Sequence, residues 1–247
     1  MSLAEIFLTI TMVYLSTCMV IYLYAKRSEK NMNLKKIWPI GFLFICILAF
    51  SLNFFNYPHI NIRQLILILL IFLWSISLTI EINKRSKIKK NLHPKPNLLL
   101  IIKMGLFQLL VSAPIISINF IPGPNWINYL DIFAISLGFM AIFLQIKSHR
   151  ELSLHLKYQA KDKFFKSKLR ISSRNPGVLG EFFFWTSLYL ISISSINGYM
   201  SIYGPLIFII YQLNIFLPRH EDKLSKRFKE FEEYKKLTGA VFPKITK

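Results

Sequence analysis

Acidic residues and cysteines are scarce in this 247-residue chain. Only 17% of the residues are charged, against about a quarter in an average soluble domain. The two cysteines, Cys18 and Cys46, lie within separate apolar stretches, where cysteine packs as a small apolar side chain. The sequence therefore offers no disulfide or zinc framework, and its aromatic content of 15% excludes a disordered chain.

Motifs of soluble catalytic domains are also missing. The chain contains no GxGxxG, GxxxxGK[ST], HExxH or CxxC, and no repeat of fixed period. We therefore expect no soluble nucleotide-binding domain and no metal site. Because its apolar residues fall in long blocks, we also expect no nucleic-acid partner, despite a net charge of +19.

Long apolar runs are abundant. A run of about 20 apolar residues is enough for a helix to cross the hydrocarbon core of a bilayer. We predict an all-α, polytopic integral membrane protein with about seven transmembrane helices. The expected spans are residues 3–24, 37–55, 65–82, 98–120, 132–146, 178–196 and 202–217.

The basic residues predict the orientation of these spans. Segments 25–36, 83–97, 147–177 and 218–247 hold 29 of the 31 Lys and Arg residues, and only Arg63 and Lys103 lie elsewhere. Because cytoplasmic loops carry the excess of Lys and Arg, we expect the N-terminus outside and the C-terminus in the cytoplasm. Residues 1–5 contain Glu5 and no basic residue, which favours a retained first span over a cleaved signal peptide.

The chain divides into two regions. Residues 1–146 form a five-span membrane region with few charges, in which Pro114 predicts a kink in the fourth span. Residues 147–247 combine a basic cytoplasmic loop, a two-helix membrane hairpin and a cytoplasmic tail. We expect the function to reside in the second region.

Polar residues cluster where this region enters the membrane. Asn175-Pro176 predicts the start of a helix, because Pro fits the first helical turn and disfavours helix before it. Glu181 then lies in the second turn, with Trp185 one turn further on the same face. A carboxylate within a membrane helix by default marks a functional site.

The returning span and the tail complete a candidate site. Tyr211 and Asn214 share a face near the end of the last span, and an antiparallel hairpin brings them to the depth of Glu181 and Trp185. We expect these four residues to line one polar pocket open to the cytoplasm. In the tail, an apolar stripe at helical spacing predicts one amphipathic helix, formed by Leu224, Phe228, Phe231 and Tyr234.

The residues of this second region resemble a known family. Ser-Arg-Asn-Pro at 173–176, followed by Gly180-Glu181 and Trp185, resembles the C-terminal domain of steroid 5-alpha-reductases and their bacterial relatives. The tail has residues typical of the same domain: Glu221, the run Tyr234-Lys-Lys-x-Thr-Gly, and Pro243. The isoprenylcysteine carboxyl and phospholipid methyltransferases of the same superfamily are also similar, with their own Arg-[His/Asn]-Pro entry and paired tail acids.

The resemblance implies a membrane enzyme with a cofactor facing the cytoplasm and an apolar, lipid-like substrate. For an NADPH-dependent reductase of an enone, the arginines would hold phosphates and the membrane residues the nicotinamide and ribose. For an S-adenosylmethionine-dependent methyltransferase, acids and Trp185 would face the sulfonium. The cofactor-binding residues expected across both are Arg170, Arg174, Asn175, Glu181, Trp185, Tyr211, Asn214, Arg219, His220, Glu221 and Tyr234.

Three interpretations stay open from the sequence. The Gly-Glu-x-x-x-Trp spacing and the Thr-Gly of the tail favour the reductase, whereas the paired acids Glu221-Asp222 favour the methyltransferase. Val178 stands where both branches usually have an aromatic residue, and Gly177 where the reductases have Asn. These departures leave a non-catalytic membrane protein as the third interpretation. Neither the catalytic residues nor the oligomeric state can be assigned from the sequence.

The predicted orientation can be tested with reporter fusions. Fusions after residues 30, 90, 160 and 240 should report the cytoplasm, and fusions near 58, 124 and 199 the outside, because the basic segments flank the first set. A cytoplasmic signal at residue 124 would contradict the arrangement of seven spans.

Overall fold

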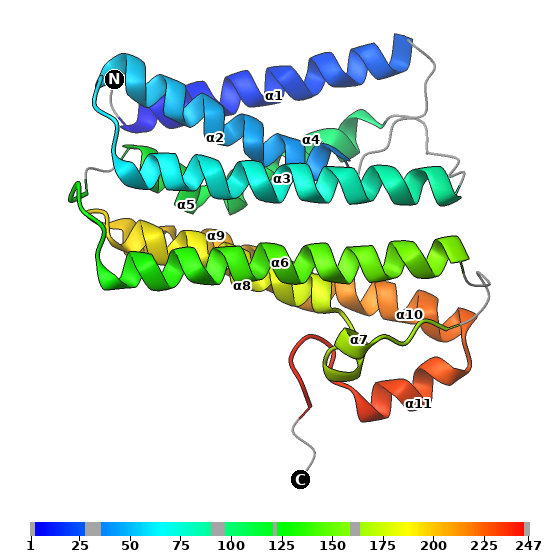
Figure 1. The fold of residues 1–247 in the computed structure, drawn as a ribbon. Coiled ribbons are helices and arrows are strands. Elements are labelled where there is room, and N and C mark those ends of the chain that lie inside the picture. The colour runs from blue at the N-terminus through cyan, green and yellow to red at the C-terminus, as the bar shows by residue number, and fades with distance from the viewer. Residues whose placement is uncertain (1–2, 28–35, 90–96, 121–122, 159–163, 245–247) are drawn as a thin grey trace.

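The computed structural model describes residues 3–27, 36–89, 97–120, 123–158 and 164–244. The protein is 85% helical, and the described residues contain no strand. Figure 1 shows the long helices side by side, with α7, α10 and α11 gathered at one end of the bundle, here called the tail end. The basic segments around residues 30, 90 and 160 lie partly outside the described residues.

The membrane-spanning helices confirm the predicted class of protein. Within the described ranges, six helical stretches are long and apolar enough to cross a membrane, and a bent pair makes a seventh. The protein is therefore an integral, multi-pass membrane protein. The first four spans are α1 (Leu3–Arg27), α2 (Ile37–Asn56), α3 (Ile62–Lys89) and the pair α4 (Leu98–Val111) with α5 (Ala113–Phe120).

The kink predicted in the fourth span is confirmed. Helices α4 and α5 meet at an angle of 50°, with Ser112 between them. Pro114 lies directly after the break. Its ring clashes with the preceding turn and its nitrogen donates no hydrogen bond, so a straight helix cannot pass through this position.

The fifth and last spans are longer than the sequence predicted. Helix α6 (Tyr129–Tyr158) continues twelve residues past the expected end at residue 146. After α8 (Pro176–Ile193), the chain returns as one helical stretch, Gly198–Arg227. That stretch consists of η2 (Gly198–Ile202), α9 (Tyr203–Tyr211), the π-helical η3 (Gln212–Phe216) and α10 (Leu217–Arg227).

The expectation of a single tail helix was wrong. Leu224 belongs to α10, Phe228 is extended, and a separate helix α11 (Glu230–Leu237) carries Phe231 and Tyr234. The wide π turn before Pro218 explains why the last span does not stop there, because a π turn accommodates the bond that proline cannot make. The break at Phe228 folds α11 back toward the short helix α7 (Lys168–Ser172) (Figure 1).

Close approach of α6 and α8 organises the second half of the bundle. A Cβ on Gly180 would lie 2.7 Å from Cγ of Gln145 and 3.1 Å from the carbonyl oxygen of Ala141. Only glycine therefore fits at this position, as is common where membrane helices pack closely. Around this contact, α3 adds Trp74, which stacks on Phe184 with 4.9 Å between ring centroids.

A buried ion pair closes the end of the bundle opposite the tail. Nε of Arg63 lies 3.0 Å from Oδ1 of Asp131, and both side chains are at most 2% exposed. The guanidinium also donates to the carbonyl oxygens of Pro124 and Trp126. Asp131 accepts a further bond from Ser194 Oγ at 3.0 Å, so α3, α6, the loop before α6 and the end of α8 are joined.

Removing one partner of this pair should strongly destabilise the protein. Asp131→Asn leaves the Arg63 charge buried without its counter-ion and should lower the free energy of unfolding by about 3–5 kcal/mol. Denaturant unfolding in detergent measures this loss. As a control, Asp222→Asn breaks a pair with Lys226 whose side chains are 58% and 76% exposed, and should cost less than about 1 kcal/mol. Equal losses in both variants would contradict this role of the buried pair.

Candidate functional site

The predicted entry into the sixth span is confirmed. Helix α8 begins at Pro176, with Asn175 as its N-cap residue and Pro in the first turn. The preceding residues Ser173, Arg174 and Asn175 are all less than 9% exposed. This buried stretch carries the Arg-Asn-Pro motif, so its partners decide how α8 is positioned.

Arg174 and Glu221 form a buried, two-pronged ion pair. Nε and Nη2 of Arg174 lie 2.9 Å and 3.0 Å from the two carboxylate oxygens of Glu221. Nη1 of Arg174 donates to the carbonyl oxygens of Lys235, at 3.0 Å, and Thr238. One side chain therefore joins the entry of α8 to α10 and to the end of α11.

Asn175 and Gly239 extend this junction. Nδ2 of Asn175 lies 3.3 Å from Oε1 of Glu221 and 3.0 Å from the carbonyl oxygen of Ala240. The backbone nitrogen of Arg174 donates to the carbonyl of Gly239 at 2.9 Å, beside an isolated parallel bridge between Ser173 and Gly239. The tail after α11 is thus held against the chain that enters α8.

Arg170 and Tyr234 lie on the other side of the junction. The Tyr234 hydroxyl donates to the carbonyl of Arg170, and Nη1 of Arg170 donates to the carbonyl of Arg174 at 2.8 Å. Burial lowers the pKa of the Arg170 guanidinium, against the opposing effects of Tyr234 and Glu151; Arg still stays charged at neutral pH. Burial raises the pKa of Tyr234, which keeps its hydroxyl protonated as a donor.

The structure thus brings five of the predicted site residues together: Arg170, Arg174, Asn175, Glu221 and Tyr234. Their polar groups mostly form hydrogen bonds with one another and with nearby backbone carbonyls. The Arg174 guanidinium is occupied by Glu221 and two carbonyls, so it has little capacity left for a phosphate. Among the described residues, the Arg170 guanidinium donates to one acceptor, the Arg174 carbonyl, so most of its donors remain unused.

Glu181 has a partner that the sequence did not indicate. Nε2 of Gln212, in the π-helical turn, donates to Oε2 of Glu181 at 3.0 Å. Gln212 is 6% exposed, and its Oε1 has no hydrogen-bond partner in the described structure. The pair places a carboxylate and an amide together inside the bundle, close to the tail end.

The expected pocket of Glu181, Trp185, Tyr211 and Asn214 is not formed as one surface. Trp185 is fully buried among aromatic rings, with centroid distances of 4.6 Å to Phe42 and 5.8 Å to Phe208. The Tyr211 ring packs on Phe107 at 4.7 Å, and the exposed Asn214 donates to its own helix. Packing of the rings decides these positions, which helical spacing alone does not specify.

The two remaining predicted residues lie on α10. Arg219 is exposed, and His220 is partly exposed and stacks on Phe216 with centroids 5.9 Å apart. Their neighbour Glu221 faces the opposite way, into the junction with Arg174. Helical geometry therefore separates Arg219 and His220 from the buried cluster.

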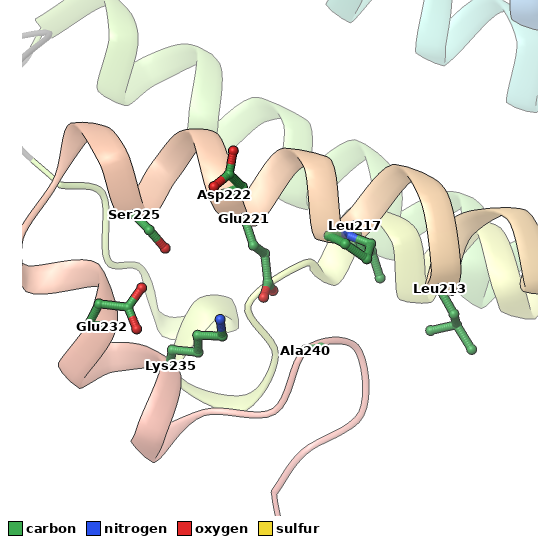
Figure 2. Close-up of a pocket in the computed structure, with 9 residues that line it drawn as sticks. Leu213, Leu217, Glu221, Asp222, Ser225, Glu232, Lys235 and Ala240 are labelled. Atoms are coloured by element: carbon green, nitrogen blue, oxygen red, sulfur yellow. The ribbon is translucent and has the colours of Figure 1, made fainter.

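An open groove lies beside the Arg174–Glu221 pair. It encloses about 490 Å³ between α10, α11 and the tail. In Figure 2 the Glu221 side chain reaches into this space toward Lys235, whereas Asp222 points to the opposite side of α10. The groove has an apolar part and an acidic part; its lining residues are Leu213, Leu217, Pro218, Glu221, Asp222, Ser225, Glu232, Lys235 and Ala240.

Sequence reasoning missed a second set of buried polar groups, on α3 and α6. Neither polar atom of Gln145, which is 1% exposed, has a hydrogen-bond partner among the described residues, nor does Nε2 of His149. Glu81 of α3 accepts a bond from Ser153 Oγ at 2.9 Å. A signal existed: Gln145, His149 and Ser153 recur every four residues and would share one face if the fifth span continued past residue 146.

Breaking the Arg174–Glu221 pair should release the tail. In Arg174→Gln the Glu221 charge stays buried without its partner, at a cost of about 3–5 kcal/mol. Hydrogen exchange should rise over residues 217–244 and less in α2 and α3. Lys226 is exposed on α10, the helix of Glu221, so Lys226→Gln should leave hydrogen exchange over residues 217–244 unaltered. Unchanged protection of the tail in Arg174→Gln would show that the pair does not hold it.

Comparison with known proteins gives one match. Neither the curated proteins nor the solved structures contain a match to the chain. One family, described as a protein of unknown function (DUF1295), matches residues 21–240, which is most of the chain. The Arg-Asn-Pro entry, Glu181 and the tail junction lie within the match. The protein therefore belongs to the DUF1295 family, which is part of the steroid 5-alpha-reductase-like group.

Proposed function

We propose that this protein is a membrane-embedded, NADPH-dependent reductase of an apolar, lipid-like enone. The observation that carries the proposal is the buried amide of Gln145, whose two polar atoms have no partner in the described structure. Buried polar groups are nearly always hydrogen-bonded, so such an amide calls for an explanation. A carboxamide, with one donor group and one acceptor, complements it.

The neighbourhood of Gln145 fits a nicotinamide. Its side chain lies across Gly180, the residue before Glu181. Glu181 and Gln212 add a carboxylate and an unpartnered amide oxygen, both acceptors for a carboxamide N–H. We assign these three residues to the nicotinamide end of the cofactor.

The cofactor phosphates need cations nearer the tail end. Arg170 is suited to this role, because most of its guanidinium donors have no partner in the described residues. Arg219 is exposed on α10 and is available at the surface. Arg174, by contrast, would act indirectly, by fixing α8 through Glu221.

The substrate would approach from the membrane. When bound, NADPH supplies a hydride to one carbon of a polarised C=C bond, and a proton from the site or from water completes the saturated product. The chain's own part is to orient the nicotinamide through Gln145, Glu181 and Gln212, and to exclude water with the aromatic core around Trp185. Apolar walls recognise a substrate by shape, so they suit a lipid-like one.

The methyltransferase is the second candidate, and the acidic groove favours it. The carboxylates of Glu221 and Glu232 lie on that groove and would attract a sulfonium cation. However, Glu221 is already neutralised by Arg174. The Trp185 ring is covered by other aromatic rings, so it offers no free face for a cation–π contact.

Binding of the two cofactors to the purified protein distinguishes the candidates. We expect NADPH to bind, and Glu181→Gln, which keeps the shape and removes the charge, to weaken it by at least about 1.5 kcal/mol. Calorimetry in detergent measures the affinity for NADPH and, in a parallel titration, the affinity for S-adenosylmethionine. Binding of S-adenosylmethionine alone would support the methyltransferase, and binding of neither would support a non-catalytic protein.

Gln145 provides a sharper test, because a structural role and a ligand-binding role predict opposite effects on stability when the amide is removed. In Gln145→Met, a similar volume replaces the unpartnered amide, so the ligand-free protein should be as stable as the parent or more so. NADPH affinity should nevertheless fall about tenfold, the effect of one lost hydrogen bond that orients the ligand. Gln64→Met is the matched control, since Gln64 bonds to Asn53 and the carbonyl of Asn119 near the Arg63 end. It should lose stability and keep its cofactor affinity per folded molecule.

A further inference from the structure

The chain after α11 forms a compact loop, residues 237–243, here called the tail loop. Its two arms touch, because a Cβ on Gly239 would overlap the carbonyl oxygen of Phe242. Across its base, Nζ of Lys244 donates to the carbonyl oxygen of Lys236 at 2.7 Å. The backbone bridge to the entry of α8 holds its middle part. The tail loop is therefore an ordered part of the fold.

One side of the tail loop packs against α8. Val241 is 3% exposed and belongs to the same apolar core as Phe182 of α8. The rings of Phe242 and Phe182 lie 6.4 Å apart between centroids. In Figure 1 the red segment after α11 turns back toward α8. The tail loop thus runs back along the bundle instead of pointing away from it.

The length of α8 sets the depth of this contact in a membrane. With 18 residues, α8 is about 27 Å long, so it needs its whole length to cross about 30 Å of hydrocarbon. Phe182 lies at the end of the second turn, about 9 Å along the helix from Pro176. The Phe242 ring beside it therefore lies below the level at which α8 enters the membrane.

Large apolar side chains on and beside the tail loop are exposed at the protein surface. Phe242 is 57% exposed and Leu237, at the end of α11, is 73% exposed. Ile171 of α7 is 71% exposed, and α7 adjoins α11 through the bond from the Tyr234 hydroxyl to the Arg170 carbonyl. Each such side chain gains about 1.5–3 kcal/mol when it leaves water for an apolar medium. Acyl chains provide that medium at this depth.

The charges of α11 change sign toward the tail loop. The first turn holds three acids and the last turn two bases: Glu230, Glu232, Glu233, Lys235 and Lys236. Lys244, at the base of the loop, adds a third exposed base. Lysines that flank inserted apolar residues bind anionic headgroups, which repel acids. This order of charges suits a helix whose last turn meets a phospholipid surface.

We propose that the tail loop inserts into the leaflet at the tail end of the bundle. Leu237 and Phe242 lie among the acyl chains, and Lys236 and Lys244 lie at the level of anionic phosphate groups. The partner of this surface is an anionic phospholipid leaflet, and the apolar surface of the spans continues into it. The proposal does not depend on the reductase, because it involves neither the cofactor nor Gln145.

Photolabelling of the unmodified, full-length protein in nanodiscs tests the insertion. The probes are phosphatidylglycerol and phosphatidylcholine that carry a diazirine on the acyl chain, and peptide mass spectrometry locates the adducts. We expect adducts on Leu237 and Phe242 at least about tenfold above those on Glu233, because acyl chains are withdrawn from water. Ile210, 58% exposed on α9 within the last span, is the positive control.

An unlabelled tail loop would overturn the proposal. If Ile210 carries adducts and residues 237–243 carry none, the loop is covered by water or by a second copy of the chain and not by lipid. Because no residue is changed, this outcome cannot result from a variant that fails to fold.

The lysines are tested by the ratio of phosphatidylglycerol to phosphatidylcholine adducts on the loop. Lys236→Gln should lower this ratio about fivefold, the effect of one lysine at an anionic surface. Lys226→Gln, which removes an equal charge from the exposed side of α10, should leave the ratio unaltered. An equal ratio in the parent and in Lys236→Gln would contradict the placement of Lys236 at the phosphates.

Discussion

The buried ion pair between Arg174 and Glu221 fixes how the tail packs against the last two spans. It joins residues 47 positions apart, whose side chains are only 9% and 10% exposed. With its counter-ion and two carbonyls the guanidinium is well satisfied, which is the condition under which a charge can be buried. Through this pair the tail is held against the entry of α8, and the depth of Glu181 follows from that entry.

Buried polar groups without partners occur at both ends of the bundle. At the Arg63 end, Arg63, Asp131, Asn128 and Ser194 bond to one another and to loop carbonyls, but Asn119 Oδ1 on α5 is buried without a partner in the described structure. At the tail end, Gln145, His149 and Gln212 keep buried polar atoms without partners there. Gln145 differs from the others because both of its polar atoms lack a partner, and the proposed function rests on it for that reason.

Between these ends, aromatic packing replaces polar chemistry. Trp74, Phe184 and Trp185 from α3 and α8 interlock with Phe42 and Phe208, and all five side chains are fully buried. Such a core gives the middle of the bundle a rigid, dry interior. Trp185 is part of this interior, and its ring lies among the other aromatic rings.

The sequence by itself determined the membrane class, the number of spans, the kink at Pro114 and the start of α8 at Pro176. These features depend on local hydropathy and on the backbone limits of proline, which act within a few residues. Of the eleven residues expected to bind a cofactor, the structure brings five together, through bonds that the sequence did not indicate: Arg170, Arg174, Asn175, Glu221 and Tyr234.

Only the tertiary structure decided that Arg174 is paired with Glu221, that Glu181 bonds to Gln212, that the tail helix is broken at Phe228, and that the Gln145 side chain lies against Gly180. Each of these depends on side chains that lie far apart in the chain and meet only when helices pack. Hydropathy and helical periodicity carry no information about such meetings, because they describe one helix at a time.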